Sequence, residues 1–414
     1  MSSNSQMLTK TQAKQRMLMM VFSAFAILFT GYPHIWSVYQ PYVMELTGWT
    51  STQASMCFYL SLAGFVVGNI IGGRIQDKSN PRMVVFAGGG IFAAGILLSA
   101  FLLIPSPLPI YFTYGIMQGV GQGMIYICII STAQKWFPGR TGFGSGIVVT
   151  ANGFCGLFLA PVSRRLLESG GPKHAFLMIG AVIALSWVLC TIFFFVPDEQ
   201  WRRKMEALAE KRSEGTELEE KKQYTSAEMM RTKSFYFLLA TMLFGLISYF
   251  MVSPVSQTYQ ISLGIPSGVA VTAVMFGSVC NAGTRLVLPS LSDKVGRVVC
   301  IKGVLAVSAV TMLVLSLSRS YAVTVSIIVL YGCYGGIMGS FPSFTSSIFG
   351  MKHSGENYGY VMLGIVIATF GAPVVTNFVT SNGYGIERAF MIGVLFAGIA
   401  FVNLLLLARE LRKN

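Results

Sequence analysis

The chain of 414 residues is 53% hydrophobic and only 11% charged, and its formal net charge is +14. Soluble proteins are usually about 25% charged, so this composition excludes a soluble enzyme and predicts a protein that is built in lipid, with no enzymatic activity expected. The positive charge does not indicate a nucleic-acid partner, because no basic face exists outside the predicted inner loops.

Windows without charge divide the chain into predicted membrane helices. Residues 83–134 and 234–284 contain no Asp, Glu, Lys or Arg, and each window can hold two spans of about 20 residues. A backbone in lipid must satisfy its own hydrogen bonds, so these windows predict α-helices. The expected spans, in chain order, are 17–42, 52–76, 81–104, 110–134, 142–165, 174–196, 235–260, 268–291, 298–318, 322–347, 356–380 and 386–408.

The distribution of Lys and Arg predicts the orientation. With the N-terminus inside, only five of the 30 basic residues fall in outer loops: Arg164, Arg165, Lys173, Arg319 and Arg388. This bias follows the positive-inside rule, so we expect both termini in the cytoplasm and the protein in the cell membrane, with lipid as a partner. The first hydrophobic stretch is too long for a signal peptide and is expected to remain as the first span.

The positions of cysteine and glycine residues predict features of the structure. The seven cysteines are scattered through apolar segments without paired spacing, which favours free thiols. The sequence has no cluster of metal ligands and no phosphate-binding glycine loop, so no metal or cofactor is expected. Glycines at four-residue spacing predict close contacts between helix backbones. They are Gly64, Gly68, Gly72, Gly115, Gly119 and Gly123.

Residues 198–233 form the one strongly polar segment, and the mixed charges predict a solvated linker between two halves, 1–197 and 234–414. Those halves repeat one another. Asp77 and Asp293 close the second and eighth spans in similar motifs and are separated by 216 residues (293 − 77), while Pro161 and Pro373 are separated by 212 (373 − 161). Two offsets this close predict a duplicated six-helix half.

Three motifs carry a resemblance to known families. The Asp-Lys-Val-Gly-Arg sequence at 293–297 resembles the loop signature of the major facilitator superfamily. The segments 135–146 and 31–39 are similar to the monocarboxylate transporter and oxalate/formate antiporter families. This resemblance implies an all-α membrane protein with twelve transmembrane helices in two pseudo-symmetric six-helix bundles. It also implies secondary transport by alternating access, and we expect the monomer to be functional.

Arg285 is the strongest candidate for a binding residue, because it is the one Lys or Arg that lies away from the ends of a predicted span. Burying it costs about 2.5–3.5 kcal/mol, and all sixteen acids lie outside the spans or at their ends. One interpretation is an arginine satisfied by backbone and water, or reaching toward the cytoplasm. The other is a bidentate site for an external anion. In monocarboxylate transporters an arginine of helix 8 binds the substrate carboxylate, and the resemblance places Arg285 there. Asn281 stands four residues earlier, where many of them carry an aspartate implicated in proton coupling.

Other polar residues are expected near the cavity, which helices 1, 4, 7 and 10 line in this superfamily. Candidate donors to a carboxylate are Tyr32, Tyr126, Tyr331, Tyr334 and Asn152, although packing roles remain open for each. His34 is a candidate proton site because imidazole titrates near neutral pH. The motif residues Asp77, Lys78, Asp293, Lys294 and Arg297 are expected to latch an inner gate through arginines and helix N-termini.

One intramembrane cation suits one carboxylate, so the predicted substrate is a small monoanion such as lactate, pyruvate or acetate rather than oxalate. Proton symport is expected, because an anion and a proton cross a membrane together more cheaply than the anion alone. The alternative is an antiporter that exchanges one carboxylate for another. A drug exporter would want an acid in the cavity, and a receptor without transport activity is the remaining alternative.

Overall fold

The computed structural model describes residues 9–201 and 223–412, and this part of the chain is helical without any strand. The N-terminal elements are α1 (Lys10–Phe29), η2 (Tyr32–Ile35), α2 (Trp36–Thr47), α3 (Ser51–Lys78), α4 (Pro81–Ser99), α5 (Leu108–Ile110), η3 (Tyr111–Met117), α6 (Gln118–Lys135), α7 (Thr141–Gly153) and α8 (Cys155–Ile192). The C-terminal elements are α10 (Ser226–Met229), α11 (Lys233–Val252), η4 (Ser253–Val255), α12 (Ser256–Ser262), α13 (Ser267–Val295), α14 (Arg297–Leu317), α15 (Ala322–Phe349), α16 (Ser354–Val361), α17 (Leu363–Ser381) and α18 (Ile386–Glu410).

Eleven helical segments among the described residues are long and apolar enough to cross a membrane, and one of them crosses twice. Thr141–Ile192 runs for 52 residues, and Gly171 interrupts it with a φ of 70°. Tyr39 donates a hydrogen bond to Ser163 and stacks on Phe176 at 5.0 Å, so the chain returns to the same place after the interruption. The structure therefore confirms the twelve predicted spans.

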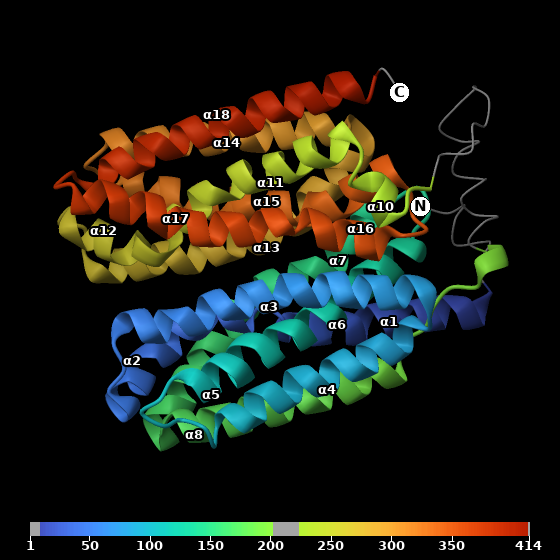
Figure 1. Ribbon diagram of the computed structural model, residues 1–414, viewed down its shortest axis with the longest axis horizontal. Coiled ribbons are helices and arrows are strands. Elements are labelled where there is room, and N and C mark those ends of the chain that lie inside the picture. The colour runs from blue at the N-terminus through green and yellow to red at the C-terminus, as the bar shows by residue number, and fades with distance from the viewer. Residues whose placement is uncertain (1–8, 202–222, 413–414) are drawn as a thin grey trace.

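The helices form two groups. Figure 1 shows α1–α8 on one side and α10–α18 on the other, with α7 lying between them. Across this boundary α3 packs against α16 and α17, and α7 packs against α13 and α15. α1 begins and α18 ends at the same end of the molecule (Figure 1). The domain boundaries at 197 and 234 stay a prediction, since most of the expected linker, residues 202–222, lies outside the described residues.

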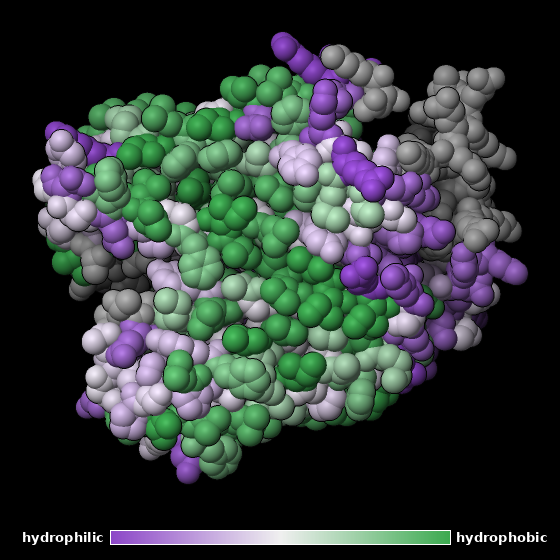
Figure 2. All heavy atoms as spheres, in the orientation of Figure 1, coloured by the Kyte–Doolittle hydropathy of each residue, from purple (hydrophilic) through white to green (hydrophobic). Residues whose placement is uncertain are grey.

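The surface matches a protein that sits in a bilayer. Figure 2 shows a broad hydrophobic band across the middle of one face, with hydrophilic residues gathered toward the ends, above all at the end where α1 begins. Large apolar side chains are exposed along this surface, for example Leu317 at 67% and Val374 at 67%. Water would penalise such exposure, whereas lipid tails accept it.

Four spans that the sequence predicts as continuous helices are interrupted in the structure, and one of these, the fifth of the twelve, divides at Phe154 between α7 and α8. The first breaks at Pro33 in η2 and the seventh at Pro254 in η4, positions that are 221 residues apart (254 − 33). Proline lacks the N–H that a helix interior requires, so it ends the hydrogen-bond ladder. The eleventh span divides at Met362 into α16 and α17. Interruptions at corresponding positions of two repeats are typical of transporter binding sites.

The two glycine stripes bring α3 and α6 together, as their spacing predicts. The Cα of Gly119 lies 3.2 Å from the position that a Cβ on Gly64 would occupy. A Cβ on Gly68 would overlap the backbone of Val120, and one on Gly123 would overlap the carbonyl of Phe65. Because the obstacle in each case is backbone, a neighbouring side chain cannot move aside to make room.

Gly68→Ala is therefore expected to destabilise the fold by about 1–3 kcal/mol, the usual cost of overpacking. The measurement is the thermal midpoint of unfolding in detergent. Gly303→Ala is the matched control, because a Cβ there meets nothing within 4 Å. An unchanged midpoint for Gly68→Ala would contradict the close packing of α3 on α6.

Candidate functional site

Arg285 lies in α13 and is 1% exposed. Its Nε donates a hydrogen bond of 2.8 Å to Asn281 Oδ1, one helical turn earlier, and its Nη1 donates one of 2.8 Å to Asn152 Oδ1 on α7. Within the described residues Arg285 forms no ion pair, and Nη2 forms no hydrogen bond. The guanidinium thus holds a full charge in the interior with only neutral partners.

Aromatic side chains from the second half surround this charge. The guanidinium carbon of Arg285 lies 5.4 Å from the ring centre of Tyr334, within cation–π range. Tyr249 of α11 stacks on Tyr334 at 4.0 Å and meets Tyr331 edge-on at 5.0 Å. The Tyr331 hydroxyl lies 3.2 Å from the Ser253 hydroxyl, at the interruption of the seventh span. The structure therefore brings Tyr331 and Tyr334 to the same site as Arg285 and Asn281.

Two buried tyrosine hydroxyls near Arg285 have no hydrogen-bond partner in the described structure. They belong to Tyr126 on α6 and Tyr358 on α16, and each is 1% exposed. Both interact electrostatically with Arg285, and the Tyr126 hydroxyl lies close enough to approach a hydrogen bond with the guanidinium. An unpaired buried hydroxyl costs about 1–3 kcal/mol, so its presence next to a cation favours a missing third group.

Tyr358 and Tyr249 are absent from the residues that the sequence analysis selects. Tyr249 precedes the Pro254 interruption by five residues, and Tyr358 precedes the break at Met362 by four, so proximity to helix interruptions was an available signal for Tyr249 at least. The break at Met362 contains no proline, and the sequence therefore offered no comparable signal for Tyr358.

Two other predicted residues lie differently with respect to Arg285. Tyr32 belongs to a separate aromatic cluster of the first half, with ring centres 5.6 Å from Tyr39 and 6.0 Å from Tyr114. His34 is partly exposed, and its ring centre lies 6.3 Å from that of Tyr334. His34 also interacts electrostatically with Arg285, so it stands at the edge of the site.

At the end of the molecule where α3 and α13 finish, the two motif aspartates accept hydrogen bonds from helix N-termini of the opposite half. Asp77 Oδ2 accepts a hydrogen bond of 3.1 Å from the backbone N–H of Glu356 in the first turn of α16. Asp293 Oδ2 accepts one of 3.1 Å from Phe143 in the first turn of α7. Asp293 also pairs with Arg297 at 3.0 Å.

The remaining motif residues behave differently. Arg297 donates a second hydrogen bond, of 3.1 Å, to the Thr141 hydroxyl at the start of α7. Lys78 and Lys294 are exposed and form no ion pair within the described part of the chain. Among the motif residues, the contacts between the halves at this end are therefore made by the two aspartates and Arg297. Outside the motifs, Arg74 of α3 adds an ion pair of 3.5 Å with Glu356 of α16.

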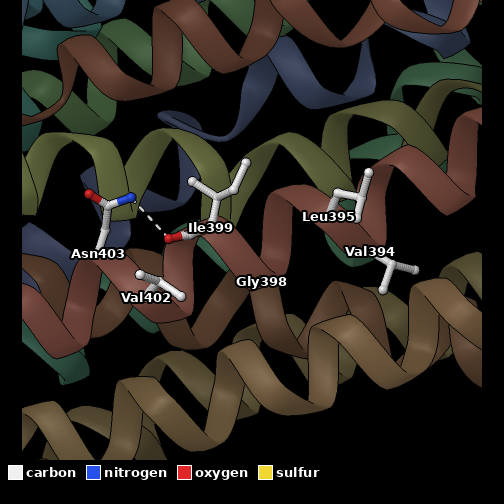
Figure 3. Close-up of a pocket in the computed structure, with 6 residues that line it drawn as sticks. All are labelled: Val394, Leu395, Gly398, Ile399, Val402 and Asn403. Atoms are coloured by element: carbon white, nitrogen blue, oxygen red, sulfur yellow. Dashed lines mark hydrogen bonds between the residues drawn. The ribbon is translucent and has the colours of Figure 1, made fainter.

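A groove on the outer surface of α18 is unrelated to these polar residues. Figure 3 shows that it is lined by one helix, and the Asn403 amide at its end donates a hydrogen bond of 2.9 Å to the carbonyl of Ile399. Leu395 and Val402 are 64% and 55% exposed, as expected for a surface in contact with lipid. The lining residues are Val394, Leu395, Gly398, Ile399, Val402 and Asn403.

Comparison with known proteins agrees with the twelve-helix architecture. The family model of the Major Facilitator Superfamily matches residues 18–373. The chain belongs to this superfamily. Its fold resembles that of XylE, a proton:xylose symporter of the superfamily, with a TM-score of 0.73, 14% sequence identity, and coverage of 94% of this chain and 95% of that one.

The amino-acid sequence is also similar to those of known transporters. It is 26% identical over 382 residues to the oxalate:formate antiporter of Oxalobacter formigenes, covering 90% of this chain and 87% of that protein. It is 30% identical over 136 residues to monocarboxylate transporter 11 of Mus musculus, covering 33% of this chain and 28% of that protein. The resemblance to both families that the sequence motifs indicate is confirmed, and the protein is an integral membrane transporter.

Proposed function

We propose that this transporter moves small monocarboxylates and that Arg285 binds the carboxylate. The observation that carries the proposal is a buried guanidinium that has no acidic partner among the described residues. A charge in such an environment is normally compensated. A carboxylate arriving from solution would compensate it during each transport cycle, and the planar fork of arginine matches two carboxylate oxygens.

The surrounding groups suit a small anion with a polar substituent. Tyr126 and Tyr358 each hold an unpaired buried hydroxyl beside Arg285. A hydroxyl can donate to a carboxylate oxygen or to the 2-hydroxyl of a lactate-like acid. Asn281 orients the guanidinium through its Nε and Asn152 accepts from Nη1, so Nη2 is the donor that remains open to substrate. Tyr331 and Tyr334 would close the apolar side of the site.

The single cation supports a monoanion. Arg285 is the one Lys or Arg among the buried residues that the structure describes, so a dianion such as oxalate would leave one charge uncompensated. The similarity to an oxalate:formate antiporter supports the alternative function, exchange of one carboxylate for another. Formate is itself a monoanion, so exchange and the monoanion argument are compatible.

Proton symport is the proposed coupling mode. A proton that accompanies the anion makes the moving unit nearly neutral, which lowers the barrier to crossing. Asn281 is neutral, so in the proposal the proton travels on the substrate carboxyl or on His34, which lies at the edge of the site. Tyr32, in its separate cluster, supports the first half and contacts the substrate only in another conformation.

The cross-half contacts of Asp77 and Asp293 are the proposed inner gate. Carboxylates at helix N-termini are stabilising, by about 0.3–1 kcal/mol each at exposed sites. Breaking these contacts would let the two halves rock about the site, as alternating access requires. We further propose the cell membrane as location, with both termini in the cytoplasm and the monomer as the working unit.

Arg285→Lys is expected to lower transport at least about tenfold, or ~1.4 kcal/mol, because an ammonium does not reproduce the bidentate fork. The measurement is uptake of labelled acids by proteoliposomes. Arg388→Lys is the matched control, since Arg388 is exposed and stacks on Tyr384 at the outer end. Normal uptake by well-folded Arg285→Ala protein would refute the assignment of the carboxylate site.

An inward-directed proton gradient is expected to drive accumulation of lactate or acetate, and a protonophore is expected to abolish it. Oxalate and succinate should compete less well than the monoanions. His34→Gln separates the two proton routes, because lost pH dependence with intact binding implicates the histidine. Accumulation that ignores the gradient and requires carboxylate inside the vesicle would instead establish exchange.

Asp293→Asn is expected to shift the inner ends of the two halves apart, because it removes the ion pair with Arg297 and the charge at the N-terminus of α7. Spin labels at Ser79→Cys and Lys352→Cys, both exposed, should report longer distances. Six of the seven native cysteines are buried and are not expected to take up label. Glu168→Gln is the control, because the Arg164–Glu168 pair lies within one helix. Unchanged distances in Asp293→Asn would contradict the gate.

A further inference from the structure

Asn152 makes a hydrogen bond that joins the two halves at the centre of the site. It lies in the last turn of α7, and its Oδ1 accepts from Arg285 Nη1 on α13 at 2.8 Å. Figure 1 shows α7 between the two groups of helices. The amide oxygen thus occupies a donor on the edge of the guanidinium that a carboxylate would use.

Thr30 determines which atom of the Asn152 amide faces Arg285. The Thr30 hydroxyl donates to the carbonyl of Ile27 at 2.7 Å, so its oxygen is left as an acceptor. Asn152 Nδ2 donates to that oxygen at 3.0 Å. With the amide nitrogen held by Thr30, the amide oxygen must point at the guanidinium.

A buried polar chain in the first half holds Thr30 in turn. The interruption at Pro33 releases the Thr30 carbonyl from the helix ladder, and Gln122 Nε2 donates to it. Gln122 Oε1 accepts from Gln118 at 2.6 Å, and Gln118 accepts from the Ser61 hydroxyl. All of these side chains are at most 2% exposed. A satisfied network of this kind is rigid, so it presents Asn152 in one orientation.

We propose that Asn152 is a neutral placeholder for the substrate carboxylate: it occupies Arg285 in the unloaded transporter, and the incoming carboxylate displaces it. The inference rests on the proposed function of Arg285. A carboxylate adds the attraction between two full charges and can accept two parallel N–H bonds, whereas the neutral amide accepts only one, so the carboxylate wins the exchange. Displacement also breaks the bond between α7 and α13, so loading the site loosens the contact between the halves.

The placeholder predicts effects of opposite sign for two substitutions. Asn152→Ala removes the competitor and should lower the Kd for L-lactate and acetate about three- to tenfold, the equivalent of one hydrogen bond. Asn152→Asp supplies a permanent counter-ion and should raise both Kd values at least about tenfold. Equilibrium binding of the two labelled acids to purified full-length protein in detergent measures each Kd.

Further variants separate the placeholder from a structural role. Thr30→Val removes the acceptor that orients the Asn152 amide. It should therefore lower the Kd, but by less than Asn152→Ala does. Asn152→Leu keeps the side-chain volume and replaces Asn152→Ala if that variant fails to fold. Asn403→Ala, on the lipid-facing groove, should leave the Kd unchanged.

The outcomes distinguish this inference from the proposed function. If the wild type binds neither acid, or if Arg285→Gln binds them normally, the proposed function fails. If binding depends on Arg285 and Asn152→Ala weakens it, Asn152 is a substrate ligand and the placeholder is overturned. Equal Kd values for the wild type, Asn152→Ala and Asn152→Leu overturn it as well.

Discussion

The architecture of the site depends on one buried positive charge. Arg285 is 1% exposed and its hydrogen bonds go to two neutral amides, so the protein carries a desolvated cation with no acid beside it in residues 9–201 and 223–412. Such an arrangement is costly in lipid, and the surrounding groups reduce the cost only in part. The ring of Tyr334 offers its negative face, while the amide oxygens of Asn152 and Asn281 offer dipoles. This incomplete compensation is the main support for the proposed binding of an anion at Arg285.

The two halves supply different parts of this environment. The second half provides the cation, Asn281 and a stacked group of tyrosines, whereas the first half provides Asn152 and the hydrogen-bonded chain behind it. Close backbone contact makes this chain possible. The glycine stripes let α3 and α6 approach closely enough for Ser61 to donate a hydrogen bond to Gln118. The packing of these two helices is thereby connected to the guanidinium by a series of hydrogen bonds.

Much of the fold could be predicted from charge alone, because lipid excludes charged side chains from long helical windows. Boundaries such as 322–347 agree closely with α15, Ala322–Phe349. Interruptions without a proline, such as the one at Met362, could not be predicted, since they arise from tertiary packing. The sequence also does not show which face of each helix is buried, because in lipid both the buried and the outer face are apolar. Periodicity therefore does not reveal that Tyr358 interacts electrostatically with Arg285 while Tyr32 belongs to a separate aromatic cluster.

Arg285 itself was predictable because a lone charge in an apolar window needs an explanation, and Asn281 because it stands one turn away. Asn152 could be named as polar but not as a partner of Arg285, because the contact joins residues 133 positions apart. For Tyr249 the one available signal was its position five residues before Pro254, in a window rich in aromatic residues. Long-range contacts of this kind depend on how the halves dock, which no local pattern encodes.

The contacts of the two motif aspartates bear on how the two halves would separate in the proposed gate. Asp77 reaches from α3 to α16, and Asp293 reaches from α13 to α7, so each half both gives and receives one contact. In the proposed gate, a rotation of one half that separates these ends would stretch both contacts together, along with the Arg74–Glu356 ion pair. Their free energies then add in a single step, which favours an abrupt transition between closed and open over a gradual widening.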